Sequence, residues 1–468
     1  MTDPGSNTYS PADARPEAPR GPLARSLMRV VDVRPEEISA LLRSLAYFFL
    51  LFASYYILRP VREEISSQDR DNLSKLWTAT FFVTVAAVPL YSAVVARYPR
   101  RVFIPRTNRF FIANLLIFFV LLLTVEEGPR IWAERAFYVW FNVYNLFVVS
   151  VAWSLMADVF RNEQSKRLFG FIALGATLGG VAGSGLTSLL VAVMPPPYLI
   201  LVSVALLELA TWFAGSLARK GVGDRERAQA AAGQATADAD RLIGGGILDG
   251  IRAVFRSPYL SGICAYLFLY TLVSTFAYQE QAHIIGEALP DRAARTVLYA
   301  RIDLAVNVLT GLAQAFVTGR LIKSIGVGAT LMILPAVAMV GFAGLGAAPI
   351  LVVLVVFQVT RRAANFALAK PSREVLFTVV GRVERFKSKS FVDTVVYRGG
   401  DMVNAWLFDG LRAMGLGFGA IAFAAIPAAG AWLFTGLALG RAQERRAAAQ
   451  AAAPAEDGAG TTRPESAP

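Results

Sequence analysis

Six arginine side chains lie inside, or at the edge of, stretches of sequence that are apolar enough to cross a lipid bilayer. They are Arg59, Arg62, Arg301, Arg361, Arg362 and Arg398. A guanidinium at the centre of a bilayer costs about 3 kcal/mol or more, so such groups normally face a polar interior lined by protein. Guanidinium groups bind carboxylates and phosphates. The first chemistry that the sequence indicates is the recognition of an anion inside a membrane protein.

Carboxylates in the same stretches nearly balance these positive charges. They are Glu63, Glu208, Glu280, Asp303, Asp393 and Asp401. The balance leaves three interpretations open: an anionic substrate, arginine–carboxylate pairs that form and break as two parts of the protein move, or a carboxylate that carries a proton. In each case the charged residues mark functional positions.

Polar residues recur at helical spacing in four of the apolar segments. In the segment 294–320, Asp303, Asn307, Thr310 and Gln314 stand at i, i+4, i+7 and i+11, which places them on one helix face. The other three segments give the sets Tyr55, Arg59 and Arg62 (44–66); Tyr270, Ser274, Tyr278 and Gln281 (259–283); and Thr394, Arg398, Asp401 and Asn404 (390–411). Because the four segments come from both halves of the chain, we expect a solute path between two helix bundles. The structural alternative is hydrogen bonding between membrane helices, at about 0.6 kcal/mol per bond.

We therefore predict a site with two parts. The residues predicted to contact substrate are Tyr55, Arg59, Arg62, Tyr278, Arg301, Asn307 and Arg398. The residues predicted to form gate pairs or to couple transport to protons are Glu63, Glu280, Asp303, Asp393 and Asp401. We expect no catalytic residue, no metal and no cofactor.

Composition explains why these segments are assigned to a membrane. Hydrophobic residues make up 55% of the 468 positions, charged residues only 17%, and the mean hydropathy is +0.49. A soluble domain does not bury that much apolar surface. The segment 168–207 has no charge, is about twice the length that one crossing needs, and is interrupted by three prolines at 195–197. It is therefore a predicted helical hairpin.

The same count along the chain predicts an all-α membrane protein with twelve transmembrane helices in two six-helix bundles, the architecture of the major facilitator type. The predicted crossings are 44–66, 76–96, 106–125, 137–157, 168–194, 198–218, 259–283, 294–320, 325–346, 349–369, 390–411 and 416–440. The predicted domains are an N-terminal tail (1–43), a first bundle (44–218), a linker (219–258), a second bundle (259–440) and a disordered tail (441–468). Gly175, Gly179 and Gly183 have the spacing of close helix packing.

Basic residues predict the orientation. With the N-terminus inside, the inner connections hold 23 Lys and Arg and the outer ones hold 9. The positive-inside rule then places both termini in the cytosol, and we expect a multi-pass protein of a bacterial inner membrane. The net charge of +12 indicates contact with anionic lipid rather than with nucleic acid. The N-terminal stretch has no apolar core typical of a cleaved signal peptide.

Several classes of protein are excluded by what the sequence lacks. One cysteine, Cys264, and one histidine, His283, cannot build a disulfide framework or a structural zinc site. No phosphate-binding GxxxxGK[ST] loop is present, which argues against ATP hydrolysis as the energy source. We expect a monomer that is not an enzyme. His283 is either a proton relay or an ordinary interfacial histidine.

Three patches of sequence resemble a known family. The first is Lys370-Pro371-Ser372-Arg373-Glu374, with Phe377, Lys387-Ser388-Lys389 and Asp393-Thr394-Val395-Val396 after it. The second is Tyr55 to Glu63, read as Y-x-I-L-R-x-x-R-E, and the third is Thr310-Gly311 with Gly326 and Pro335. These patches are similar to the nucleotide (ATP/ADP) transporter family of plastids and intracellular bacteria. The resemblance implies a major facilitator-like fold and an antiporter that exchanges ATP and ADP.

One departure from the family pattern affects the expected substrate. Where the family has Arg-x-Gly-Lys, this chain has Arg398-Gly399-Gly400-Asp401. An aspartate in place of a lysine removes a phosphate-binding charge, which argues against ATP/ADP exchange itself. We predict a divergent member from a free-living bacterium that carries a phosphorylated or carboxylated metabolite.

Two other functions stay open at this point. A proton-driven exporter of a neutral or cationic compound would use Asp303 or Asp401 as its proton site. A membrane scaffold or sensor that transports nothing would leave Arg398 without a role.

Overall fold

The computed structural model describes residues 32–97, 100–160, 162–232, 254–381, 384, 388–389 and 391–452, and all the regular elements in these ranges are helices. The predictions for the first 31 residues, for 233–253 of the linker and for 453–468 of the tail concern residues outside the described ranges.

Six long helices make up the first half of the chain: α2 (Ile38–Gln68), α3 (Leu73–Arg97), α4 (Arg100–Thr124), α5 (Glu127–Val159), α6 (Asn162–Leu190) and α7 (Leu199–Ala232). The short 3-10 turns η2 (Pro35–Glu37), η3 (Arg70–Asn72) and η4 (Pro196–Tyr198) lie before or between them. The three prolines at 195–197 separate α6 from α7, as predicted, because a proline ring cannot continue the hydrogen bonding of a helix interior.

The described residues of the second half form seven α-helices: α9 (Pro258–Ala288), α10 (Arg292–Ala313), α11 (Gly319–Ala347), α12 (Leu351–Ala364), α13 (Lys370–Leu376), α15 (Tyr397–Ala413) and α16 (Phe418–Ala452). The π-helical turns η5 (Gln314–Thr318), η6 (Asn365–Ala369) and η8 (Val392–Val396) extend α10, α12 and α15, and the 3-10 turn η7 (Phe377–Val379) follows α13. Gly326 has a positive φ of 79°, which favours glycine, and there the chain turns from its eighth crossing to its ninth.

These helices form the twelve predicted crossings. Nine described segments are long and apolar enough to span a membrane by length and hydropathy alone. One of them, Arg292–Ala347, holds two crossings that meet at Gly326, and α3 and α15 supply the last two. The row of polar residues on α15 lowers the mean hydropathy of this helix. Neighbouring helices rather than lipid must therefore cover its polar face.

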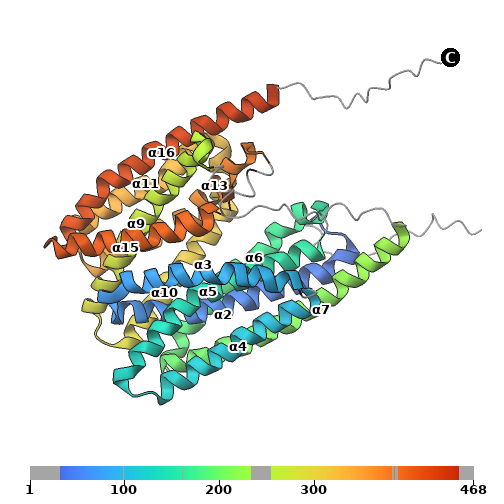
Figure 1. Ribbon diagram of the computed structural model, residues 1–468, viewed down its shortest axis with the longest axis horizontal. Helices are drawn as coiled ribbons and strands as arrows, with labels where there is room; N and C mark the ends of the chain where they lie inside the picture. Colours follow the sequence, from blue (N-terminus) through green and yellow to red (C-terminus); the bar gives the residue numbers. More distant parts are fainter. Residues whose placement is uncertain are drawn as a thin grey trace, which may run out of the picture.

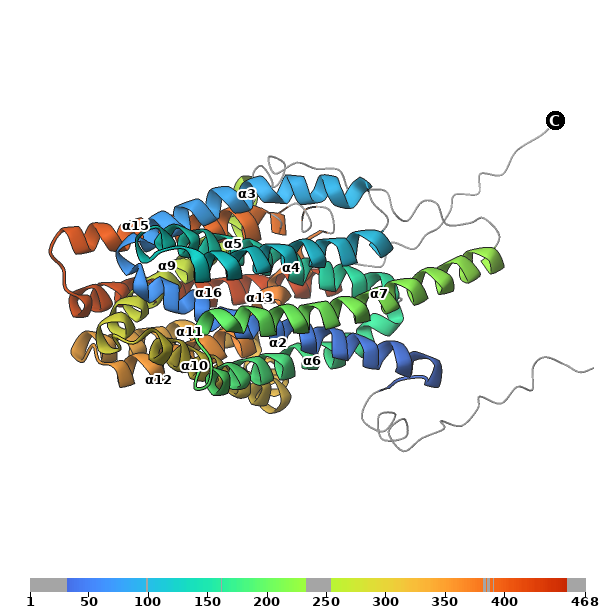
Figure 2. The ribbon, with the colours of Figure 1, turned by 90° about the horizontal axis from the view of Figure 1, so that it is seen from below.

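The two bundles are visible as two groups of helices (Figure 1), with α2, α4, α5, α6 and α7 in one and α9, α11, α15 and α16 in the other. Most helices run side by side along the long axis of the molecule (Figure 2). The groups converge toward one end of this axis and diverge toward the other in Figure 1. We call the convergent end, where α2 meets α3 and α9 meets α10, the Asp69 end. The opposite end, where α2 begins and Gly326 lies, is the Gly326 end.

Close backbone contact holds α2 against α6, as the glycine spacing predicts. A Cβ atom added to Gly175 would lie 2.6 Å from the carbonyl oxygen of Leu45, and one added to Gly183 would lie 2.5 Å from that of Ala53. In the second half, α11 and α16 approach each other in the same way at Gly328. Small residues thus let the helix backbones approach closely. Such close packing stabilises helix pairs in a membrane, where the hydrophobic effect does not drive helices together.

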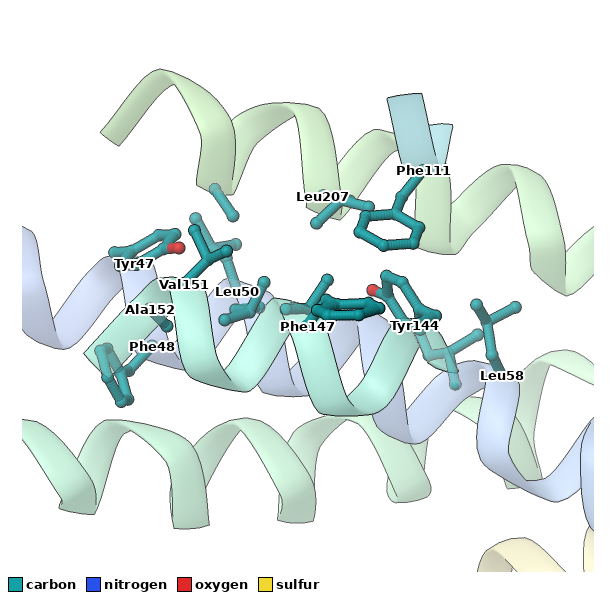
Figure 3. Close-up of a cluster of buried hydrophobic side chains, with 14 of the residues drawn as sticks. Tyr47, Phe48, Leu50, Leu58, Phe111, Tyr144, Phe147, Val151, Ala152 and Leu207 are labelled. Atoms are coloured by element: carbon teal, nitrogen blue, oxygen red, sulfur yellow. The ribbon is translucent and has the colours of Figure 1, made fainter. Parts of the chain in front are cut away.

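The buried apolar side chains form two clusters, one centred on each half, and the first also includes Ala282 of α9. In the first half, aromatic rings dominate: Figure 3 shows Tyr47, Phe48, Tyr144 and Phe147 packed between α2 and α5, with Leu207 of α7 beside them. Aromatic rings bury a large apolar area with few rotatable bonds. Because each half has its own packed apolar cluster, we treat the two halves as two rigid bundles in contact with each other.

Two helices continue past the predicted domain boundaries. α7 continues to Ala232, past the predicted start of the linker, and α16 continues to Ala452, past the predicted start of the tail at 441. Both extensions are rich in Ala, Arg, Gln and Glu, which have high intrinsic helix propensity. Absence of apolar periodicity indicates only that a segment leaves the membrane; it does not indicate that the helix ends.

Candidate functional site

The two halves meet where α2, α3, α5 and α6 contact α9, α10 and α15, a region that we call the seam. Asp303 of α10 lies within it and is 1% exposed. Its Oδ1 atom accepts a hydrogen bond from Arg59 Nη1 of α2 at 2.9 Å and another from Arg362 Nη2 of α12 at 2.5 Å. Asp303 therefore holds one guanidinium from each half.

Arg62, one turn after Arg59 on α2, lies in an aromatic cage. Its Nη2 atom is 2.9 Å from Glu63 Oε1, and its guanidinium lies over the rings of Tyr138 at 5.0 Å and Tyr278 at 5.6 Å. Arg62 Nη1 also donates to the Tyr278 hydroxyl at 3.4 Å. Since Tyr278 belongs to α9, this cage too is shared by both halves. Desolvated cation–π contacts of this kind contribute about 2 kcal/mol.

Arg361 differs from the other seam arginines because its partners are neutral. Only 6% of it is exposed. Its Nη1 atom donates to Ser274 Oγ at 3.2 Å and its Nη2 atom to Gln358 Oε1 at 2.8 Å. Its Nε atom has no partner, and no carboxylate pairs with it, among the described residues. Arg361 is close enough to Arg59 and Arg362 for the three charges to act on one another.

A further charged pair lies on α15. Arg398 Nη1 is 3.7 Å from Asp401 Oδ2, and the Arg398 guanidinium lies over the Tyr397 ring at 5.7 Å. The Tyr397 ring in turn contacts Tyr270 of α9 at 5.8 Å. Arg62 is near enough to act electrostatically on Asp401 across the seam. The α15 pair therefore belongs to the same polar region as the α2 arginines.

The depth of this region follows from the helix geometry. Arg59 precedes Gln68, the last residue of α2, by nine positions, which corresponds to about 14 Å at 1.5 Å per residue. Asp303 follows Arg292, the first residue of α10, by eleven positions, or about 17 Å. For a hydrocarbon core about 30 Å thick, both residues lie near its middle.

A second charged group closes the seam at the Asp69 end. We call it the Glu64 latch; it consists of Glu64, Gln68 and Glu134 of the first half and Arg292 and Arg295 of the second. Glu64 accepts from Arg292 Nη2 at 2.8 Å and from Arg295 Nη2 at 2.8 Å. Arg295 also donates to Gln68 at 2.6 Å, and Arg292 reaches Glu134 at 2.9 Å. Two arginines of one half are thus bound by three side chains of the other.

Neighbouring bonds extend this closure. The hydroxyl groups of Ser67 and Tyr299 are 2.5 Å apart across the seam, and Asp71 lies 3.5 Å from His283 Nε2. Together with the bonds of Asp303 and Tyr278, these contacts join the two halves in the middle of the bundle and at the Asp69 end. Near the Gly326 end, the ion pair between Glu37 and Arg167 stays within one half.

The structure brings together most of the predicted site residues. Those that lie at the seam are Tyr55, Arg59, Arg62, Glu63, Tyr278, Asp303, Asn307, Arg398 and Asp401. Asn307 contacts α6, where its side chain donates to Ser184 Oγ at 3.4 Å. For Asn307 the contact agrees with the alternative in which polar side chains hydrogen-bond membrane helices to one another rather than line a solute path.

Three predicted residues lie apart from this group. Arg301 is exposed, on a different face of α10 from Asp303. Asp393 is in η8, near Lys370, Arg373 and Lys389 and away from the middle of the bundle. Glu280 is 1% exposed on α9, and its Oε1 atom has no partner among the described residues. Glu208, which we counted among the balancing carboxylates, pairs with Arg109 on an exposed surface.

Sequence reasoning left two sets of residues out of the predicted site. It counted Arg361 and Arg362 among the six arginines but assigned them no contact. It missed Glu64, Arg292 and Arg295 entirely. A signal was available for Glu64, because a second acidic residue directly after Glu63, still within an apolar segment, also requires a polar partner.

Comparison with known proteins agrees with this architecture. No protein-family model matches the chain, and no curated protein matches it in sequence. Solved structures do match. The nucleoside transporter NupG superposes with a TM-score of 0.59 at 13% identity, covering 86% of this chain and 99% of that chain.

Two other solved structures give the same result. A D-xylose-proton symporter has a TM-score of 0.58 at 12% identity, with 85% of this chain and 97% of that chain covered. A POT family transporter in complex with a thioalcohol-conjugated peptide has a TM-score of 0.57 at 10% identity, with 87% and 96% covered. The chain has a major facilitator-like fold. All three proteins are transporters rather than enzymes, and none is a nucleotide (ATP/ADP) transporter, so membership of that family stays a prediction.

Proposed function

We propose that this protein is a secondary-active transporter that moves an anionic metabolite, a nucleotide or another organic phosphate or carboxylate, by alternating access. The observation that carries the anionic substrate is the uncompensated charge around Arg361. Near Asp303 the seam holds four arginines, Arg59, Arg62, Arg361 and Arg362, against two carboxylates, Glu63 and Asp303, an excess of two positive charges when all are ionised.

An excess of two buried positive charges destabilises the folded protein unless an anion binds beside them. A buried charge whose partner is missing destabilises a protein by about 3–5 kcal/mol. An anionic substrate placed against Arg361 supplies the missing charge and forms charge-assisted hydrogen bonds, each contributing about 1.5–3 kcal/mol. Phosphate and carboxylate groups both fit a guanidinium in this way.

The position of the cross-half bonds supports alternating access. The Glu64 latch joins the halves at the Asp69 end, and the ribbons diverge toward the Gly326 end (Figure 1). Rocking the halves about the central site would break the latch and open the Asp69 end. If both termini are cytosolic in a bacterial inner membrane, as the basic loops predict, the Asp69 end that the latch closes faces outward.

Counterflow into proteoliposomes tests the proposal. Vesicles loaded with unlabelled ATP, ADP, glucose 6-phosphate or citrate are given a trace of the same labelled compound outside. We expect at least one anion to exchange faster than in protein-free vesicles, and Arg361→Gln to reduce this exchange at least 10-fold. The matched control is Arg301→Gln, which removes an exposed arginine of similar depth. No exchange of any anion, or equal effects of the two variants, would refute an anionic substrate at Arg361.

The exporter of a neutral or cationic compound remains the second candidate because Asp401 is available as a proton site. Asp303 is bonded by two guanidiniums, whereas Asp401 has one ion-pair contact among the described residues, with Arg398 at 3.7 Å. This candidate predicts transport that collapses with an uncoupler and that ignores added phosphates.

A further inference from the structure

One face of α9 carries a row of buried polar side chains that the proposed substrate site does not use. Thr271, Thr275, Gln279 and His283 follow one another at i+4, and they are 0%, 0%, 1% and 8% exposed. Residues at this spacing lie on the same side of a helix. The row runs from the middle of the bundle to the Asp69 end.

This face of α9 packs against α15. Asn404 Nδ2 donates to Thr271 Oγ1 at 3.1 Å, and a Cβ atom on Gly400 would collide with the Thr271 side chain. At the other end of the row, the His283 ring lies 6.3 Å from the ring of Phe408. We call Thr271, Thr275, Gln279, His283 and Asn404 the α9 lane.

Several polar atoms of the α9 lane have no partner among the residues that the structure describes. Thr275 Oγ1, both side-chain atoms Nε2 and Oε1 of Gln279, and Asn404 Oδ1 are buried without a hydrogen bond to any described residue. Each such atom lowers the stability of the folded protein by about 1–3 kcal/mol if it stays without a hydrogen bond. Four of them in one row therefore indicate that another molecule supplies the hydrogen bonds.

The spacing of the row fits water as that partner. Successive side chains are about 6 Å apart along the helix axis, four residues at 1.5 Å each. This separation is too long for a direct hydrogen bond, but it matches two bonds of about 2.8 Å through one water molecule. Buried waters typically serve polar groups that would otherwise have no partner.

The two ends of the α9 lane lie near solvent and near Asp401. His283 Nδ1 lies 2.9 Å from the Gln279 carbonyl oxygen, which can only accept, so Nδ1 carries the hydrogen and Nε2 faces Asp71. Asp71 has an 86% exposed side chain, and Arg70 and Arg412 are the other charged groups near His283. At the inner end, Asn404 lies one turn from Asp401.

We propose that the α9 lane holds a file of water molecules that carries protons between solvent at the Asp69 end and the Asp401 carboxylate. A proton enters beside His283, each water passes one proton to the next, and the Asp401 carboxylate becomes neutral on receiving it. The file then returns to its starting protonation. Because the lane runs inside the second half, it stays connected while the Glu64 latch closes the seam to larger solutes.

Cysteine accessibility tests whether the lane is wet. In a Cys264→Ser background, Thr275→Cys and Gln279→Cys place a thiol in the lane, and Val273→Cys places one at similar depth in the apolar cluster, where Val273 is 1% exposed. A small charged methanethiosulfonate reagent reacts with the thiolate, which forms in water and not in an apolar core. We expect both lane thiols to react at least 10-fold faster than the Val273 thiol. Equal rates at all three positions would overturn the proposal.

Proton movement is tested without any substrate. Proteoliposomes that contain a pH-sensitive dye receive a potassium diffusion potential, and the rate of internal acidification is recorded. Gln279→Leu is expected to slow proton entry at least fivefold, because leucine keeps the size of the side chain and removes both hydrogen-bonding atoms, while Val273→Ile leaves the rate unchanged. Wild-type entry no faster than in protein-free vesicles, or equal rates in the two variants, would overturn the proton route. Neither assay requires an anionic substrate, so either result is separate from the proposed function.

Discussion

Neutralising Glu64 is the most direct perturbation of the latch. The carboxylate accepts three hydrogen bonds across the seam: from Arg292 Nε at 3.0 Å, from Arg292 Nη2 at 2.8 Å and from Arg295 Nη2 at 2.8 Å. A hydrogen bond between charged groups is about 1 kcal/mol stronger than a bond to a neutral acceptor. Glu64→Gln therefore weakens the closed Asp69 end by about 3 kcal/mol, which changes the ratio of closed to open states roughly 100-fold.

This change is large enough to measure. If the latch keeps about 99% of molecules closed at the Asp69 end, Glu64→Gln brings the two states to roughly equal populations. Spin labels at Trp132 and Met414, both exposed near this end and on different halves, report the separation of the halves. Cys264→Ser removes the native thiol first.

We expect double electron–electron resonance to give one short distance in the wild type and an additional longer distance in Glu64→Gln. Glu127→Gln, an exposed carboxylate at the same end, is the control and should keep the wild-type distribution. Identical distributions in Glu64→Gln and Glu127→Gln would show that the latch does not hold the halves together.

Three further predictions concern stability in detergent, measured by thermal unfolding. Gly179→Val should lower the melting temperature more than Gly170→Val, by an excess that corresponds to about 1–3 kcal/mol. A side chain at Gly179 would meet the α2 backbone, whereas nothing lies within 4 Å of a side chain at Gly170. Equal losses in the two variants would contradict the close α2–α6 contact. Asp303→Asn should destabilise the ligand-free protein by about 3–5 kcal/mol, since two buried guanidiniums lose their carboxylate, and an added anion should recover part of this loss. A double-mutant cycle of Ser67→Ala and Tyr299→Phe should give a coupling of about 0.5–1.5 kcal/mol, and a coupling near zero would remove this bond from the closure.

The sequence predicted the crossings and much of the seam because both follow from local patterns. Apolar length marks a membrane helix, and i, i+4 spacing places Arg59 and Arg62 on one face of α2 and Asp303 and Asn307 on one face of α10. Pairing across 244 positions, as between Arg59 and Asp303, has no such local pattern, so the bonds themselves could not be predicted.

The misplaced residues have physical reasons as well. Arg301 stands two positions before Asp303, and residues at i and i+2 do not share a helix face, so the spacing rule that selected Asp303 could have excluded it. The Glu64 latch escaped notice because charges near a helix end also suit the membrane surface, where they need no partner. Only the packing of α2 against α10 distinguishes the two cases.

The central claim, that a desolvated Arg361 at the seam binds an anion, is tested most directly by ligand-dependent thermal shift of the purified protein. ATP, ADP, inorganic phosphate, glucose 6-phosphate and citrate are compared with neutral adenosine and xylose in wild type, Arg361→Gln and Arg301→Gln. A ligand at 100 times its Kd stabilises the folded state by about 2.7 kcal/mol. The account predicts that at least one anion, and neither neutral compound, raises the melting temperature of the wild type and of Arg301→Gln, and that Arg361→Gln loses this shift. A melting temperature that no anion changes, or an equal shift in all three proteins, would contradict it.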